Sequence, residues 1–267
     1  MQKDIRSFFA SSSSSSSSSS FREGCKANKG ANCSVNGKRY EEKVLGIARN
    51  LRYMQTNDNN DNNDNKDNNN LFCNLFSTAG STRTYDVVCM MITTKIPIEA
   101  KIKNAPDWGQ VSLKRDIHSS SYISTNAIVN EYIRDQTLFN NHMPPIHGMK
   151  TYEEWKTFKN NCGGLFNDMY FDCRSDTIRR FYTAKGVFYI QISELGLYHL
   201  GNDICRFQCP IFDCKQRIRV RIKVHSRSPL RLSVMASCQP QCINDLPQSP
   251  FSLDSFDRLP DNLKKAD

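Results

Sequence analysis

Residues 85–103 have the sequence Tyr-Asp-Val-Val-Cys-Met-Met-Ile-Thr-Thr-Lys-Ile-Pro-Ile-Glu-Ala-Lys-Ile-Lys. Its two halves are apolar runs separated by a short polar turn, which predicts a hairpin of two strands. In the second half, apolar residues alternate with Glu99, Lys101 and Lys103. Successive side chains of a strand point to opposite faces, so these three polar side chains are expected to share one face.

Apolar periodicity on either side of this hairpin predicts the remaining elements. Helices are expected at 38–54, 108–117, 126–139, 151–161 and 175–184, and strands at 71–76, 85–92, 96–103, 186–193 and 215–225. The central order is helix, three strands, helix. We therefore expect an α/β fold in which helices flank a mixed central sheet.

Low-complexity segments divide the rest of the chain. An unbroken serine run, 11–20, buries no apolar surface, so 11–36 is predicted to be a disordered linker after a short peptide, 1–10. The Asn/Asp-rich stretch 57–70 is predicted to be a disordered insertion within a domain spanning 37–243. The Pro-, Asp- and Ser-rich residues 244–267 are expected to form a loosely held tail.

The overall composition favours a soluble intracellular protein with a polyanionic partner. The formal net charge is +9, no apolar run approaches the roughly 20 residues that cross a bilayer, and no signal peptide is evident. The eleven cysteines are therefore expected to be mostly reduced thiols. The wide spacing of Cys205, Cys209, Cys214, Cys238 and Cys242 makes a structural zinc site the less favoured interpretation.

Two carboxylates and a lysine of the hairpin could together form a metal-dependent hydrolytic site. The short turn can bring Asp86 beside Glu99, and two converging carboxylates are tolerated when a divalent cation lies between them. Mg²⁺ also binds phosphate oxygens, and Lys101 on the same face could orient or deprotonate a water molecule. Asp86, Glu99 and Lys101 therefore predict a site for phosphodiester hydrolysis, whereas Glu-x-Lys alone is common on solvated strands.

This arrangement resembles the PD-(D/E)xK nuclease superfamily, whose members share the restriction-endonuclease-like fold. The matching residues are Asp86 and Glu99-Ala100-Lys101, with Tyr85 where many members have proline. The resemblance implies Mg²⁺ or Mn²⁺ at Asp86, Glu99 and Ala100, joined by a glutamate of the first core helix. Glu41 fits that position, and Glu42 is the alternative.

Many superfamily members also carry a glutamine at the start of the helix after the E-x-K strand. Gln110 in the predicted helix 108–117 resembles that residue, which implies an auxiliary catalytic role near the metal or the phosphate. Lys103 and Lys114 are expected to contact the DNA backbone. The resemblance covers about 37–117 and leaves open whether the enzyme is an endonuclease or an exonuclease.

Residues 217–225 predict a strand with one strongly basic face. Ile218, Val220, Ile222 and Val224 alternate with Arg217, Arg219, Arg221, Lys223 and His225. Like charges on one strand face repel each other unless an anion lies over them. A phosphate backbone is the favoured partner, and a solvated edge strand is the alternative.

The N-terminal peptide resembles a PIP box, the motif that docks on the sliding clamp PCNA. Gln2, Ile5, Phe8 and Phe9 match its pattern, and one helical turn would present the three apolar side chains together. The resemblance implies tethering to PCNA during DNA replication, repair or recombination, in the nucleus or at a viral or cellular replication site. The expected function is thus a clamp-bound Mg²⁺-dependent DNA nuclease; the alternative is a non-catalytic DNA-binding adaptor of the same fold.

Overall fold

The computed structural model describes residues 24–54, 70–72, 76–77, 87–91, 94–116, 118–145 and 148–265. The chain divides into two compact units, Met1–Val35 and Asn36–Asp267. The described part of the first unit is the beginning of helix α1 (Gly24–Ala48), which starts within the segment expected to be linker. The second unit is a mixed α/β domain, as the sequence predicts, and contains all the other described elements.

A mixed five-stranded sheet contains the predicted hairpin. Its strand order is β10-β9-β5-β4-β3, with only β5 and β9 parallel. The strands are β3 (Phe76–Ser77), β4 (Val87–Met91), β5 (Thr94–Lys101), β9 (Tyr189–Ile192) and β10 (Gly196–His199). The parallel pair requires a crossover, and helix α4 (Thr177–Thr183) lies in that connection.

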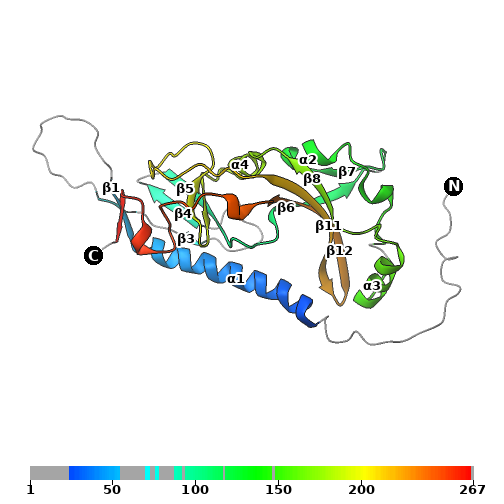
Figure 1. The fold of residues 1–267 in the computed structure, drawn as a ribbon. Helices are drawn as coiled ribbons and strands as arrows, with labels where there is room; N and C mark the ends of the chain where they lie inside the picture. The colour runs from blue at the N-terminus through cyan, green and yellow to red at the C-terminus, as the bar shows by residue number, and fades with distance from the viewer. Residues whose placement is uncertain are drawn as a thin grey trace, which may run out of the picture. The chain divides into compact units, whose positions relative to one another are not determined.

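A second five-stranded sheet is antiparallel and curled (Figure 1). Its order is β7-β6-β12-β11-β8. The strands are β6 (Trp108–Arg115), β7 (Tyr122–Ser124), β8 (Met169–Cys173), β11 (Gln216–Arg227) and β12 (Leu230–Pro240). Helices α2 (Ala127–Ile133) and α3 (Tyr152–Asn161) accompany it, and α3 begins with a capping box between Thr151 and Glu154.

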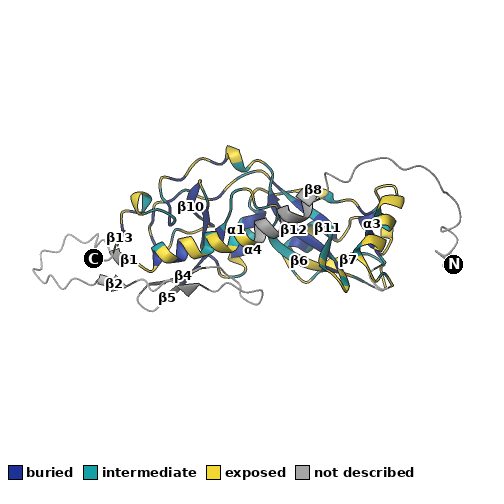
Figure 2. Ribbon diagram, turned by 90° about the horizontal axis from the view of Figure 1, so that it is seen from below, coloured by how far each residue is buried: buried dark blue, intermediate teal, exposed yellow. Residues whose placement is uncertain are grey.

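Two apolar cores hold these layers together. The first core joins both five-stranded sheets to α4 through residues such as Trp108, Tyr182, Ile190 and Ile218. The second core packs the last turns of α1 on the mixed sheet, and it includes Val44, Ala48, Ile98 and Tyr189. Figure 2 shows the resulting alternation of buried and exposed residues along the later part of α1, residues 35–48. Apolar side chains at helical spacing explain this burial.

The sequence predictions for α3, α4, β4, β5, β9 and β11 are confirmed in type and approximate position. The predicted helix at 108–117 is wrong, because these residues form strand β6, which pairs with β12. The helix predicted at 126–139 ends at Ile133, and the one predicted at 38–54 gives way to strand β1 (Leu51–Met54). No element was predicted for β12.

The C-terminal segment is packed rather than loosely held, which corrects another prediction. Strand β13 (Leu263–Lys265) pairs with β1, which also pairs with β2 (Asn70–Phe72). Leu246, Leu253 and Leu263 are buried in the two cores. None of the helices in the described ranges has the length and apolar character needed to cross a membrane.

Candidate functional site

Strand β5 presents different chemistry on its two faces. Ile96 and Ile98 pack in the second core with α1. Glu99 and Lys101 alternate with these residues, so they leave the opposite face. On that face the Nζ atom of Lys101 lies 5.9 Å from the centroid of the Tyr182 ring on α4. The side-chain alternation expected for this strand is therefore present.

Glu99 is a nearly buried carboxylate with a cationic neighbour. The residue is 7% exposed, and its Oε1 atom forms an ion pair with Nζ of Lys101, whose side chain is 17% exposed. Removing a carboxylate from water is costly unless a cation or hydrogen-bond donors compensate for the lost hydration. The pair thus places a carboxylate and an ammonium together in a site that is largely shielded from solvent.

Asp86 lies outside the described residues. The register of the hairpin is described: Val87 pairs with Ile98. These are the residues immediately after Asp86 and immediately before Glu99 in the sequence. On the other side of β5, Glu99 and Lys101 pair with Ile190 and Ile192 of β9.

Glu41 and Glu42 lie on α1, the helix that packs against the opposite face of β5 from Glu99. The backbone of α1 therefore lies over the other face of β5 from the one that carries Glu99 and Lys101. The neighbouring Tyr40 instead joins a polar network in which its hydroxyl donates to Asp254 (2.9 Å) and accepts from Nε2 of Gln191 (3.0 Å). Burial, followed by the charge of Asp254, raises the pKa of Tyr40.

Gln110 lies at the other five-stranded sheet, because its segment is strand β6 and not a helix. Its Oε1 atom accepts a hydrogen bond from Nζ of Lys223 on β11, at 2.8 Å. The last of the three described α-helices between β5 and its parallel partner β9 is α4, whose Tyr182 hydroxyl accepts a hydrogen bond from the backbone N–H of Gly109 (3.1 Å). The helix-start argument for a catalytic Gln110 is thus lost.

The basic strand has the alternation that its sequence predicts. Ile218 and Val220 of β11 are fully buried in the first core. The intervening cationic side chains leave the opposite side, which we call the outer face of the curled sheet. Its β11 members are Arg217, Arg219, Arg221 and Lys223, all partly exposed.

Carboxylates that the sequence analysis did not single out hold two of these arginines. Asp107, with a side chain only 2% exposed, lies 3.1 Å from Arg219 and 2.5 Å from Arg221. Ser237 also donates a hydrogen bond to Asp107, at 2.7 Å. Asp168 accepts from Nε of Arg219 at 2.9 Å. The expected repulsion along the strand is therefore partly compensated within the protein.

The cations of β11 also influence the titration of two groups on this strand. Burial lowers the pKa of Lys223, and the neighbouring Arg221 lowers it further. Burial also lowers the pKa of His225, with further contributions from Lys223 and Arg231. Neighbouring cations are the smaller cause of both shifts, after burial, and like charges on one strand face favour an anion over that strand.

Arg217 makes a different contact. Its guanidinium carbon lies 4.1 Å from the centroid of the Tyr170 ring on β8, and Tyr170 is 48% exposed. β8 is the edge strand of the curled sheet. The structure therefore adds an exposed aromatic ring to the basic patch, which the strand pattern alone did not reveal.

Lys103 and Lys114 lie at separate places. Nζ of Lys103 is 3.9 Å from Glu194, a distance at the limit of an ion pair, and its backbone N–H donates to Ser193 at 2.9 Å. Lys114 is exposed on β6 and pairs in register with Ile123 of β7. Neither lysine contacts Glu99 in any described interaction.

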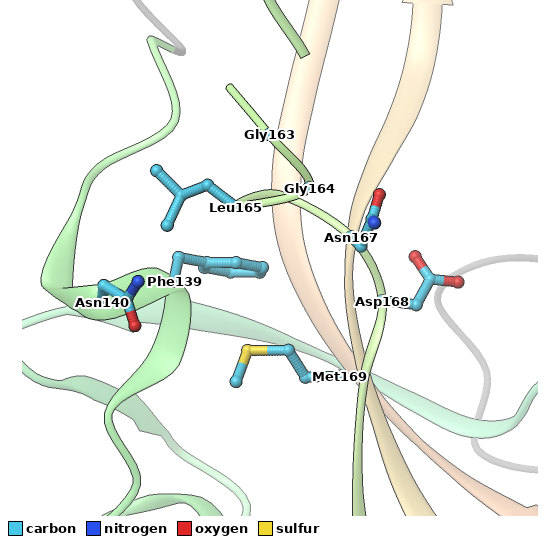
Figure 3. A pocket seen from close by; sticks show the side chains of 8 residues that line it. All are labelled: Phe139, Asn140, Gly163, Gly164, Leu165, Asn167, Asp168 and Met169. Carbon is cyan, nitrogen blue, oxygen red and sulfur yellow. The ribbon is translucent and has the colours of Figure 1, made fainter. Parts of the chain in front are cut away.

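A cavity of about 350 Å³ adjoins Asp168. Figure 3 shows Leu165, Phe139 and Met169 around it, with the carboxylate of Asp168 turned away from Phe139. The remaining lining residues are Asn140, Gly163, Gly164 and Asn167. Its single carboxylate is already engaged with Arg219, so the cavity is not assigned a chemical role.

Four of the five cysteines considered for zinc lie in or against the two cores, and Cys242 is exposed. Cys205 and Cys209 pack in the second core, whereas Cys238 lies in the first. Burial raises the pKa of Cys238 and of Cys214 to about 12, which opposes the thiolate form that binds metal. Within the part of the chain that the structure describes, no group of three or more His, Cys, Asp or Glu residues could hold a metal ion.

The predicted clamp-binding residues Gln2, Ile5, Phe8 and Phe9 lie outside the described residues. Comparison with protein-family models, curated proteins and solved structures gives no match.

Proposed function

We propose that this chain is a Mg²⁺-dependent DNA nuclease with a restriction-endonuclease-like core. The observation that carries the proposal is the placement of Glu99 and Lys101 in contact on one face of β5. Part of the topology supports it: β3, β4 and β5 form an antiparallel run that follows α1 in sequence, and β9 pairs with β5 in parallel. The helix expected directly after β5 is absent, because strands β6 and β7 come next.

Asp86 and Glu99 would hold the cation. Ala100, which lies between Glu99 and Lys101 in the sequence, is the third proposed metal-binding position of this segment. The donor set fits Mg²⁺, which prefers carboxylate oxygens, and the pairing of Val87 with Ile98 supports a position of Asp86 near Glu99. When bound, the cation would supply Lewis-acid stabilisation of a phosphate. Glu41, with Glu42 as the alternative, is the less supported ligand because α1 covers the other face of the sheet.

Lys101 is the proposed group that orients the attacking water, and it would accept the water's proton only in its neutral amine form, after its ammonium has lost a proton to solvent. Its ammonium is partly shielded from solvent and lies between the Glu99 carboxylate and the Tyr182 ring. Binding of a cation by Glu99 would weaken the carboxylate's hold on Lys101. The lysine would then be available for a water or a phosphate oxygen.

The basic outer face is the proposed DNA-binding surface, through Arg217, Arg219, Arg221 and Lys223. Asp107, which forms ion pairs with Arg219 and Arg221, is only six positions after Lys101 in the sequence. Six extended residues span at most about 20 Å, so one bound strand could reach both places. The N-terminal peptide is the proposed PCNA ligand, which would raise the local concentration of the nuclease on DNA.

The test is cleavage of linear, nicked, flapped and single-stranded DNA in Mg²⁺ or in EDTA. We expect cleavage only with the metal, and a loss of activity in Asp86→Ala and Lys101→Ala. Asp135→Ala and Lys159→Ala are matched controls, since Asp135 is a 76% exposed surface residue and Lys159 lies on α3. Cleavage by both site variants at the wild-type rate would refute the assignment.

Binding of DNA without any cleavage across this panel would instead support the non-catalytic adaptor. The clamp peptide has its own test, which is binding of PCNA by the chain with Phe8→Ala and Phe9→Ala combined. Unchanged PCNA affinity in that variant would refute the peptide and leave the nuclease proposal standing.

A further inference from the structure

The outer face of the curled sheet combines cations with planar groups. Arg217 lies over the Tyr170 ring, and 48% of Tyr170 remains exposed. Arg219, Arg221 and Lys223 follow on the same side of β11. An arginine against an aromatic ring presents a flat, cationic surface on which another planar group can stack.

This surface is also held in place before any ligand arrives. Asp107 and Asp168 fix the guanidinium of Arg219, and Asp107 also fixes that of Arg221. Gln110 accepts a hydrogen bond from Lys223. Side chains that are already ordered lose less conformational entropy on binding, so they contribute more of their contact energy to affinity.

The geometry favours a single strand over a duplex. In a duplex the bases stack on one another, and the protein meets mainly phosphates and groove edges. An exposed aromatic ring on a sheet gains stacking energy only from an unpaired base. Tyr170 lies on β8, the edge strand among the described strands of this sheet, where a base can approach from the side that has no further described strand.

We propose that the outer face binds single-stranded nucleic acid, with a base stacked on the Tyr170–Arg217 pair and phosphates contacting Arg221 and Lys223. This rests on the proposed function and narrows its substrate class. It assigns Tyr170, a residue with no place in the nuclease motif, as a substrate-binding residue.

The test is fluorescence anisotropy with a labelled oligothymidine and a duplex of equal length, in EDTA so that no cleavage occurs. We expect the single strand to bind more tightly than the duplex. Tyr170→Ala should weaken single-strand binding by roughly 5- to 150-fold, since a stacked base contributes about 1–3 kcal/mol. Its duplex affinity should stay the same, and Tyr170→Phe should retain single-strand affinity.

A matched control is available in the same chain. Arg227 lies over the Tyr152 ring at 4.4 Å, but Tyr152 packs against the first core and not on the outer face. Tyr152→Ala should therefore leave single-strand affinity unchanged. Arg217→Lys keeps the positive charge and loses the planar guanidinium. It should therefore weaken binding of the single strand more than binding of the duplex.

Equal affinities for the two substrates, or wild-type single-strand binding by Tyr170→Ala, would overturn the inference. These outcomes are separable from failure of the nuclease assignment. If the nuclease proposal holds, Lys101→Met should abolish cleavage and keep single-strand binding. If the enzyme instead acts on duplex DNA, Tyr170→Ala should cleave duplex DNA at the wild-type rate. A preference for duplex that persists at high salt would assign the face to double-stranded DNA instead.

Discussion

The Oδ1 atom of Asp107 lies 3.1 Å from the Nη1 atom of Arg219, and this ion pair joins the segment after β5 to the middle of β11. Asp107 is almost fully buried and also contacts Arg221. Asp107→Asn should lower the free energy of unfolding by about 3 kcal/mol, because it leaves two guanidinium groups with less compensation in a partly dry setting. Urea unfolding followed by circular dichroism measures the change.

The control for that prediction is Asp135→Asn, which alters a carboxylate that is 76% exposed. Exposed ion pairs contribute about 0–1 kcal/mol, so its unfolding free energy should be close to that of the wild type. Equal effects of the two substitutions would show that Asp107 has no special structural role.

Gln191 on β9 is expected to anchor the C-terminal segment. It is fully buried; its Oε1 accepts the N–H of Leu253 at 2.8 Å, and its Nε2 donates to Ser252 at 2.9 Å. Gln191→Met should cost about 1–3 kcal/mol by leaving these buried groups without partners. It should also increase hydrogen exchange in residues 249–254. Unchanged exchange there would contradict this role.

Gly109 is a position where glycine is required. It has φ of +59°, and an added Cβ would lie 2.6 Å from the Phe181 ring. Gly109→Ala should therefore destabilise the domain by about 2 kcal/mol or more through backbone strain and overpacking. Gly37→Ala is the control, because nothing lies within 4 Å of its added Cβ. A melting temperature lowered equally by both substitutions would contradict the prediction.

His225 should report on anion binding to β11. Burial and nearby cations hold its pKa below the usual 6.5, so the neutral imidazole is favoured in the free protein. A bound polyanion favours the protonated form and should raise this pKa. Binding then takes up protons, and affinity should rise as pH falls through the interval between the bound and free pKa values. NMR titration of the imidazole with and without oligothymidine measures both midpoints.

The assignment of that resonance comes from its disappearance in His225→Gln, which should also flatten the pH dependence of affinity. A His225 midpoint that stays the same when the oligonucleotide binds would place the ligand away from this strand.

The parts of the site that were predictable from the sequence depend on local periodicity. Glu99 and Lys101 share a face because side chains of a strand alternate, and the same rule separates Arg219 from Ile218. The turn after β4 is short, so the hairpin register follows from neighbouring residues. These relations need no knowledge of distant parts of the chain.

Other features depend on distant partners. Trp108–Arg115 becomes a strand because it pairs with β12, whose Met235 lies opposite Ser112 and far away in sequence. Asp107 similarly meets Arg219 only when the sheet has formed. The tail prediction failed because it rested on Pro-, Asp- and Ser-rich composition alone, whereas Ser249 and Ser252 are buried and hydrogen-bonded. Tertiary pairing overrides local propensity in all three cases.

The most direct test of the central claim is single-turnover DNA cleavage in Mg²⁺ by Lys101→Met and Glu99→Gln, with Lys159→Met and Glu153→Gln as matched surface controls. We predict that both site variants lose about 100-fold or more in rate while keeping single-strand affinity, because a positioned acid–base group contributes about 10²–10⁴. The controls should cut like the wild type. Wild-type cleavage by Lys101→Met would contradict the account.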